Sequence, residues 1–244
     1  MKQNTIILPA DLVKPFFNKK WHKDKNFDQS IYLSKYVNLS ENSIFNKLLP
    51  LLDSNDNILD LGCGDGRLSL SLASKQFKNI SAWDFSEEAI SRLNHISDTK
   101  HYQINTKIID INKAHIDKSN YNLVICASTL HYFNDLKVEK LLKKINNALK
   151  KSGIIYLTFE TELKLSLADG TGFAFSNQPK RTIEDSVKLT KNFFEPLGYK
   201  IILSKTHKKI IYPTLPTLIA NKLKTNEEKY TREMKLYEVI LQAP

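Results

Sequence analysis

The sequence predicts a single α/β domain built on a doubly wound sheet, and three observations point to this fold class. Short apolar segments alternate with amphipathic segments along most of the 244 residues, as expected when parallel strands are joined by crossover helices. Gly62, Gly64 and Gly66 directly follow the first of these apolar segments, where such sheets hold a ligand-binding turn. The content of 41% hydrophobic residues, with seven glycines and eight prolines, excludes collagen-like and low-complexity architectures.

Residues 1–40 are polar with interleaved aromatic side chains and show no strong period. We therefore expect an N-terminal extension of short helices and loops that forms a cap or lid. Its apolar patch at residues 6–8 is soon broken by a proline and an aspartate, which argues against a secretory signal. Ser40 is placed to cap a helix with Ile44 and Leu48 on its apolar face, ended near Pro50.

Seven segments are predicted as strands: 58–61, 80–83, 107–111, 123–127, 154–159, 199–204 and 236–241. The fourth is apolar throughout, as expected for a central strand that is buried on both faces. The last two lack a clear helical pattern between them, so we expect antiparallel edge strands there.

Helices are predicted between these strands from apolar spacing and capping residues. One follows the glycine run, and the next begins at Ser86 with two glutamates in its first turn, which suits the helix dipole. Residues 135–150 carry apolar side chains at helical spacing. A further helix opens on a Thr182–Asp185 capping box and closes at Gly198.

The formal net charge of +10 raises the possibility of a nucleic-acid partner. Only four of the 36 basic residues are arginine, the type suited to bidentate phosphate contacts. The richness in lysine, asparagine and isoleucine is typical of an AT-rich genome. Codon bias is therefore the favoured source of the charge, with a polyanion-binding surface as the alternative.

Cys63 and Cys126 are far apart and lie in predicted core or glycine-rich segments. They indicate reduced thiols of a cytoplasmic protein, and we expect both to be packing residues and not nucleophiles. No apolar run reaches the roughly 18–20 residues that span a bilayer, so no membrane partner is predicted. No His, Cys and Asp cluster has metal-ligand spacing, so no metal is predicted.

The glycine run departs from two common phosphate-binding patterns. The third glycine of G-x-G-x-x-G is replaced by Arg67, and the G-x-x-x-x-G-K-[ST] pattern is absent. Asp60, two residues before Gly62, would repel a pyrophosphate because both groups are negatively charged. Its carboxylate suits a ligand with positive charge and no phosphate, and S-adenosyl-L-methionine is such a ligand.

Residues 58–66 resemble the first motif of class I S-adenosylmethionine-dependent methyltransferases of the small-molecule type. The resemblance continues in residues 82–90, in Asp110-Ile111 and in residues 121–133. It implies a Rossmann-like sheet of seven mostly parallel strands with one antiparallel strand and helices on both faces. It also implies S-adenosyl-L-methionine as cofactor and S-adenosyl-L-homocysteine as product.

The resemblance carries specific roles onto this chain. Asp84, eighteen residues after Gly66, is expected to bind both ribose hydroxyls, although it could simply cap the following helix with Glu87. Asp110 is expected to meet the exocyclic amine of adenine, although aspartate is also common in loops. The expected cofactor-binding residues are Asp60, Gly62, Cys63, Gly64, Asp84, Phe85, Asp110, Ile111, Cys126, Ala127 and Tyr36.

The resemblance also suggests how one domain over residues 1–244 is organised. We expect a cofactor-binding half at 41–160 and a substrate-side half at 161–244. Within the latter, 161–180 and 212–233 are longer than ordinary connections, and such segments are commonly lids or insertions.

Methyl transfer is an in-line displacement, so the protein must chiefly align an acceptor and exclude water. His131 is the leading candidate for a general base because it follows the fourth strand, near where the family places the methyl group. The alternative is a packing role. The aromatic residues within 16–36, with Phe173 and Phe175, could wall an acceptor pocket.

Absent motifs narrow the acceptor. Residues 127–130 lack the Asn/Asp-Pro-Pro-aromatic motif of adenine-amine methyltransferases, and neither cysteine has the neighbouring proline that methylation of the cytosine ring carbon requires. A small-molecule acceptor is therefore favoured. One alternative is methylation of RNA or of a ribosome-associated protein, which predicts lysines converging on the Asp60–His131 rim. The other is a non-catalytic S-adenosylmethionine-binding protein. The sequence does not indicate an oligomeric state.

Overall fold

The computed structural model describes residues 5–16, 44–176, 179–213, 215, 217–227 and 229–244. Its main sheet has the order β4-β3-β2-β5-β6-β9-β8. The bounds of these strands are β2 Asn57–Leu61, β3 Asn79–Asp84, β4 Ile104–Ile108, β5 Tyr121–Cys126, β6 Leu149–Ser166, β8 Lys200–Ile211 and β9 Thr231–Gln242. The strands from β4 to β6 are parallel, whereas β9 runs antiparallel to both of its neighbours. The predicted antiparallel strand is thus confirmed, but of the two C-terminal strands only β8 is an edge strand, because β9 lies between β6 and β8.

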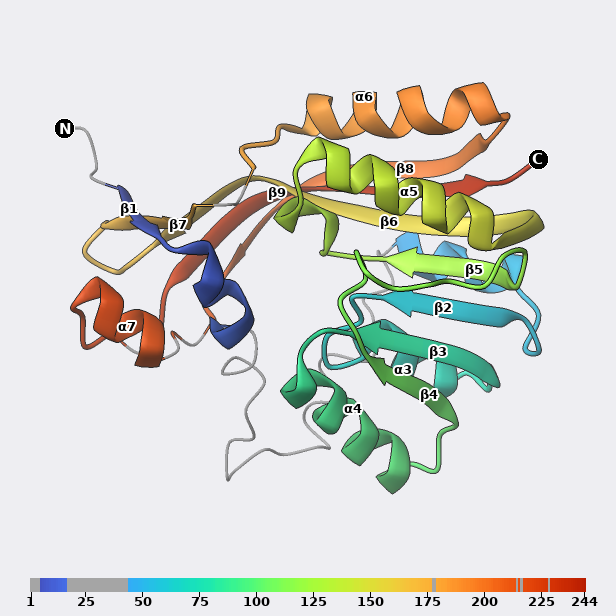
Figure 1. Ribbon diagram of the computed structural model, residues 1–244, viewed down its shortest axis with the longest axis horizontal. Coiled ribbons are helices and arrows are strands. Elements are labelled where there is room, and N and C mark those ends of the chain that lie inside the picture. The colour runs from blue at the N-terminus through green and yellow to red at the C-terminus, as the bar shows by residue number, and fades with distance from the viewer. Residues whose placement is uncertain (1–4, 17–43, 177–178, 214, 216, 228) are drawn as a thin grey trace.

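The helices cover both faces of this sheet (Figure 1). Their bounds are α3 Arg67–Ala73, α4 Glu87–Thr99, α5 Asp135–Ala148 and α6 Ile183–Phe194. Strand side chains such as Leu59 and Val124 form a core with α5 and α6. The alternate positions, such as Ile58 and Leu123, face the opposite core with α3. Neighbouring residues of one strand face opposite cores because side chains alternate between the two faces of a sheet.

The sheet has nine strands and not the predicted seven. β6 is 18 residues long and continues past its neighbours, and a turn at Gly170 (φ +87°) returns the chain as β7, Gly172–Phe175. β7 pairs antiparallel with the end of β6, and β1, Thr5–Leu8, pairs parallel with β7. The sequence reading missed both strands because short strands inside presumed connections carry too little pattern to be distinguished from loops.

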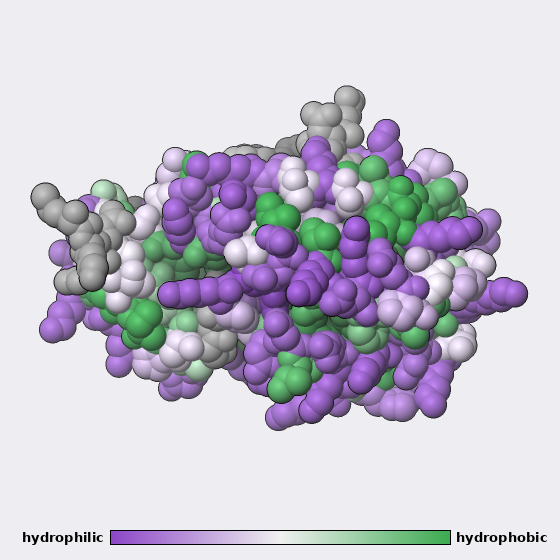
Figure 2. Space-filling model, turned by 90° about the horizontal axis from the view of Figure 1, so that it is seen from above, coloured by the Kyte–Doolittle hydropathy of each residue, from purple (hydrophilic) through white to green (hydrophobic). Residues whose placement is uncertain are grey.

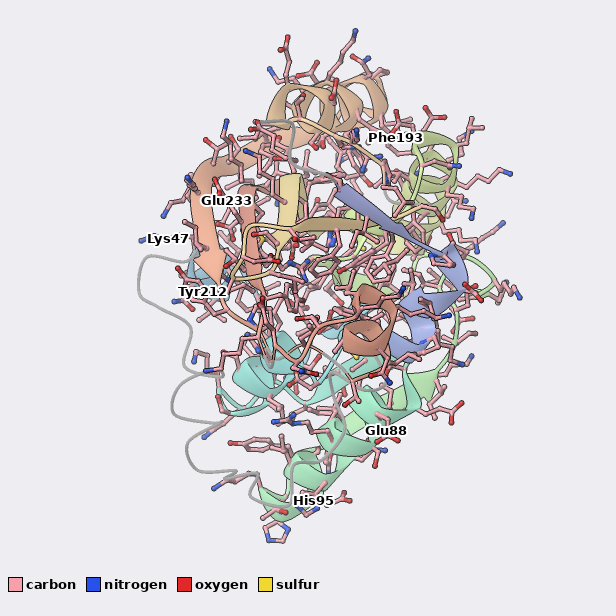
Figure 3. The ribbon with its side chains drawn as sticks, turned by 90° about the vertical axis from the view of Figure 1, so that its left-hand side faces the viewer. Lys47, Glu88, His95, Phe193, Tyr212 and Glu233 are labelled. Atoms are coloured by element: carbon pink, nitrogen blue, oxygen red, sulfur yellow. The ribbon has the colours of Figure 1, made fainter. Side chains whose placement is uncertain are left out.

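The extra strands belong to what we call the small lobe: β1, the 3₁₀ turn η1 (Ala10–Leu12), β7, the distal ends of β6 and β9, and helix α7 (Thr217–Leu223). It has its own apolar core, which includes Phe173 of β7, Ile219 of α7 and Tyr230. The lobe stands beyond the carboxyl ends of β2, β3 and β5, at the left of Figure 1. Figure 3 faces this side, with α7 and β1 in front, between Glu88 of α4 and Phe193 of α6.

Several predicted boundaries are confirmed and others shift. The Ser86 side chain accepts a hydrogen bond from Ala89 N, and the Thr182–Asp185 capping box is present. The expected helix at 44–49 is instead two 3₁₀ turns, η3 (Ile44–Lys47) and η4 (Leu49–Leu51), since Pro50 supplies no backbone donor there. Its proposed cap, Ser40, lies outside the described residues, as does most of the segment expected to be a helical cap. β4 begins and ends three residues before its predicted bounds.

Within the described ranges, no helix is both long and apolar enough to cross a membrane. The surface over α6, seen in Figure 2, mixes hydrophilic and hydrophobic side chains without a single continuous patch of either kind.

Candidate functional site

The glycine loop, residues 62–66, connects β2 to α3 and is fixed by close backbone packing. Gly62 N and Cys63 N donate to Trp83 O of β3 at 2.7 and 3.1 Å. Gly62 (φ +72°) leaves room for Thr129, because a Cβ atom at position 62 would lie only 2.4 Å from Thr129 Oγ1. Gly66 also has a positive φ, so larger residues at both positions would combine backbone strain with a clash.

Two buried carboxylates flank the glycine loop. Asp60, at 2% exposure, accepts a hydrogen bond from the Ser69 hydroxyl at 2.7 Å. Asp84, at the end of β3, accepts from Gly64 N at 2.9 Å and from Ser86 N at 2.8 Å. Burial, with a smaller effect of the Asp84 charge, raises the pKa of Asp60 to about 7. A cation held beside Asp60 would favour its ionised form, so this corner is suited to a positively charged ligand.

A third acid in the loop has a different environment. Asp65 is buried, and its carboxylate oxygens lie 3.8 Å from Arg67 Nε and 3.9 Å from Arg92 Nε. Because two guanidinium groups face it, we interpret Asp65 as fixing the loop against α4. The sequence reading did not single out this residue, since an aspartate in a glycine-rich turn is unremarkable in sequence.

The adenine-side candidates lie next to Asp84. Ile109 N donates to Asp84 O at 2.8 Å, which brings the segment after β4 to the end of β3. Asp110 is exposed and accepts from Asn112 N at 3.0 Å, so it also organises its own turn. Ile111 is buried in the main core, whereas Phe85 is half-buried.

The remaining cofactor candidates differ in accessibility. Cys126 is fully buried at the end of β5, and Ala127 after it is half-buried. Cys63 is half-buried and its thiol lies 3.5 Å from Gly64 O. Burial raises the pKa of both thiols, which keeps them protonated and agrees with packing roles. Tyr36 lies outside the described residues.

The loop after β5 contacts the glycine loop through Thr129 and then leads to a second group of polar side chains. Thr129 Oγ1 lies 3.3 Å from Gly62 O and 3.0 Å from Ala127 O, the acceptors available to its hydroxyl. Ser128 has a positive φ of 51°, and its N donates to Thr158 Oγ1 of β6 at 2.7 Å. The chain then enters the 3₁₀ turn η5 (Leu130–Tyr132), which carries His131.

His131 belongs to what we call the buried cluster, formed with Glu160 of β6, Arg232 of β9 and Tyr132. His131 Nε2 lies 3.5 Å from Glu160 Oε2 and 3.4 Å from Arg232 Nη2. Arg232 Nη2 also forms an ion pair with Glu160 and donates to the Tyr132 hydroxyl at 3.3 Å. His131, Glu160 and Arg232 are each at most 8% exposed. Sequence analysis identified His131 but missed its two charged partners, which lie in strands remote in sequence.

A second arginine fixes the turn that carries His131. Arg181 is buried, donates to Leu130 O and Phe133 O, and forms an ion pair with Asp135. These bonds satisfy carbonyl groups on both sides of η5, so the position of His131 depends on Arg181 as well as on the buried cluster.

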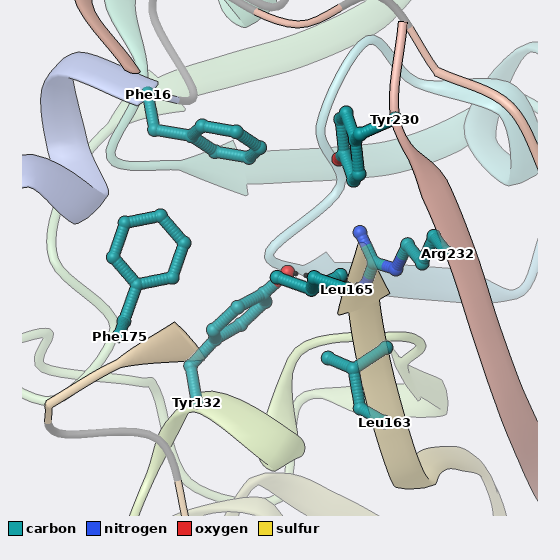
Figure 4. A pocket seen from close by; sticks show the side chains of 7 residues that line it. All are labelled: Phe16, Tyr132, Leu163, Leu165, Phe175, Tyr230 and Arg232. Atoms are coloured by element: carbon teal, nitrogen blue, oxygen red, sulfur yellow. Dashed lines mark hydrogen bonds between the residues drawn. The ribbon is translucent and has the colours of Figure 1, made fainter. Parts of the chain in front are cut away.

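A small pocket lies where the small lobe meets the main sheet (Figure 4). Tyr132 and Arg232 line it from the buried cluster, and Phe16, Phe175 and Tyr230 line it from the small lobe. Phe175 had been predicted as a pocket wall, and it does line this pocket. Phe173 instead packs in the core of the small lobe, with its ring centroid 5.5 Å from that of Tyr230.

Residues 58–153 match a family model described as a methyltransferase domain. The chain is 31% identical over 96 residues to the probable S-adenosyl-L-methionine-dependent methyltransferase TehB of Haemophilus influenzae; the match covers 39% of this chain and about a third (33%) of that one. It is 26% identical over 152 residues to the carboxy-S-adenosyl-L-methionine synthase of Nautilia profundicola, covering 58% of this chain and 64% of the relative.

The fold is shared with solved structures. The crystal structure of Haemophilus influenzae TehB superposes with a TM-score of 0.60 at 19% identity, covering 89% of this chain and 68% of that one. Magnesium protoporphyrin IX methyltransferase from Synechocystis, solved with S-adenosylmethionine bound, gives a TM-score of 0.56 at 15% identity, covering 93% and 95% of the two chains.

Proposed function

We propose that the chain methylates a small-molecule acceptor in the cytoplasm, with S-adenosyl-L-methionine as the methyl donor. The premise is the match of residues 58–153 to a methyltransferase domain and the similarity to S-adenosyl-L-methionine-dependent relatives. The binding site of the methyl donor is assigned to the glycine loop, and the acceptor is assigned to the side of η5 that the small lobe covers.

The observation that carries this proposal is the pair of buried carboxylates beside the glycine loop. Asp84 is assigned to the two ribose hydroxyls, because Gly64 N and Ser86 N hold its buried carboxylate at the end of β3, beside the glycine loop. Asp60 is assigned to the positively charged end of the cofactor. Backbone groups of Gly62 and Gly64 are assigned to the same ligand, since the glycines permit its close approach.

When bound, S-adenosyl-L-methionine supplies a methyl group already activated by its sulfonium. The remaining work of the protein is alignment and exclusion of water. Leu130 and His131, on η5, are assigned to the acceptor side of the methyl group. His131 is assigned as the base for an acceptor that must lose a proton. Glu160 Oε2, 3.5 Å from Nε2, favours the protonated imidazole that results, whereas Arg232 Nη2, at 3.4 Å, opposes it.

A small acceptor is preferred over RNA or a protein because the small lobe covers this side of η5 with aromatic and aliphatic side chains. A macromolecular substrate would require an open basic rim, whereas the charged groups at this position, Glu160 and Arg232, are buried and paired with each other.

The cofactor assignment is tested by thermal-shift and calorimetric titration of the purified chain. We expect S-adenosyl-L-homocysteine to raise the melting temperature, and NAD and ATP to leave it unchanged. Stabilisation by NAD or ATP without an effect of S-adenosyl-L-homocysteine would overturn the proposal. Binding of the cofactor without turnover over a broad acceptor panel would favour a non-catalytic binding protein instead.

A further inference from the structure

Lys144 is the one lysine of α5 that turns toward the interior of the protein. It is half-buried, whereas the other lysines of the helix are exposed. Its Nζ donates to Asn112 O at 2.6 Å, to Ala114 O at 2.9 Å and to Ile111 O at 3.4 Å. A lysine ammonium has three N–H donors and no acceptor, so these three carbonyl groups use its full capacity.

The three carbonyl groups belong to the turn that begins at Asp110, directly after β4. Asp110 O accepts from Lys113 N at 2.9 Å and from Ala114 N at 3.0 Å. The Asp110 side chain takes part in the same turn, since its Oδ1 accepts from Asn112 N and from Asn112 Nδ2, both at 3.0 Å. The direction of the Asp110 carboxylate therefore depends on the backbone that Lys144 holds.

Other contacts attach the turn to the cofactor corner without using Lys144. Ile109 N donates to Asp84 O at 2.8 Å, and Ile111 packs in the main core. The pairing of β3 with β4 ends at Asp84 and Ile108, before the turn begins. Loss of the Lys144 ammonium should therefore leave the strands paired and should chiefly release the backbone of residues 111–114.

We propose that Lys144 is a positioning residue for the adenine of S-adenosyl-L-methionine, and that it acts by fixing the turn that directs the Asp110 carboxylate. This inference rests on the proposed function and on the resemblance that assigns Asp110 to the exocyclic amine of adenine. A carboxylate only accepts hydrogen bonds and the amine donates them, so the pairing depends on the direction of the carboxylate. Lys144 is not itself assigned to the ligand.

The test measures selectivity for adenine as well as affinity. S-inosyl-L-homocysteine has a carbonyl oxygen where S-adenosyl-L-homocysteine has the amine, so it presents an acceptor to the Asp110 carboxylate. We expect calorimetric titration of the wild-type protein to show at least about tenfold tighter binding of S-adenosyl-L-homocysteine. In Lys144→Met, which keeps the aliphatic chain and removes the ammonium, this ratio should fall to about twofold or less.

A merely structural role of Lys144 predicts a different result. A general loss of stability would weaken both ligands by the same factor and would leave their ratio unchanged. Lys143→Met is the matched control, because Lys143 is exposed on the same helix and its loss removes the same charge. We expect the control to keep the wild-type ratio, and an equal fall in both variants would show an effect of charge alone.

Lys144→Gln provides the same comparison if Lys144→Met does not fold. Its neutral amide is shorter and keeps only two donors, so a fall in the ratio is again expected. Thermal melting of each variant establishes that it is folded before titration. A wild-type protein without a preference for adenine, or a full preference retained on loss of the ammonium, would overturn the inference.

The inference and the proposed function fail separately. Absence of S-adenosyl-L-homocysteine binding to the wild-type protein would overturn the proposed function. Intact binding with a ratio that does not respond to Lys144 would overturn only the role given to this lysine.

Discussion

The glycine-loop corner and the pocket beneath the small lobe differ in charge and in how the chain builds them. The first comes from neighbouring segments within one βαβ unit and holds two buried acids, Asp60 and Asp84. The second is assembled from segments spread from Phe16 to Arg232 and holds a buried arginine. The acidic corner suits a cation, whereas the charge of the pocket arginine, Arg232, is already balanced by Glu160.

Replacement of His131 should give the largest effect and should separate the two regions most clearly. We expect His131→Ala to lower turnover about 100-fold or more if His131 is the base, while the affinity for S-adenosyl-L-homocysteine stays nearly unchanged. Turnover is measured as S-adenosyl-L-homocysteine release with an acceptor that the wild-type protein methylates. Equal losses of turnover and cofactor affinity would make His131 a structural residue.

Asp84→Ala tests the glycine-loop corner. We expect the affinity for S-adenosyl-L-methionine to fall tenfold or more, about 1.4 kcal/mol, because the charged acceptor for the ribose hydroxyls is lost. Calorimetry measures this affinity, and an unchanged value would remove Asp84 from the cofactor site.

The ionisation of Asp60 should make the binding of S-adenosyl-L-methionine depend on pH. Asp60 has a pKa of about 7, and a bound cation favours its ionised form. The affinity for S-adenosyl-L-methionine should therefore rise with pH through 7 and be roughly tenfold weaker at pH 6 than at pH 8. Asp60→Asn, which cannot ionise, should give weak binding with a flat profile. A flat profile in the wild-type protein would contradict the assigned role.

Arg181→Gln should have the smallest effect on cofactor binding, because it changes the stability of the acceptor side and not the glycine loop. The substitution leaves Leu130 O and Phe133 O with a weaker donor, so we expect a loss of about 1–3 kcal/mol in the free energy of unfolding. Lys188→Gln, on the exposed face of α6, is the matched control for loss of one positive charge. Chemical denaturation measures both variants, and equal stabilities would show that Arg181 does not fix η5.

The same contrast explains what the sequence could predict. Asp60, the glycines and Asp84 lie within about 25 residues and follow one repeating strand-turn-helix pattern, so local signals were enough to bring them together. Glu160 and Arg232 are paired through the β6–β9 ladder, where Leu165 stands opposite Arg232. Nothing local to either residue indicates a partner so remote in sequence. β1 was missed for the same reason, since its partner β7 is remote in sequence, whereas β7 was missed because four residues carry too little pattern.

The length of β6 constrains how the pocket can open. Because β6 and β9 stay paired from the main sheet into the small lobe, up to Ser166 opposite Thr231, the lobe cannot swing away without breaking that ladder. β1, by contrast, is held by four residue pairs to β7. We therefore expect a ligand to enter by detachment of β1 and the residues up to Phe16 from β7, while the β6–β9 ladder stays in place.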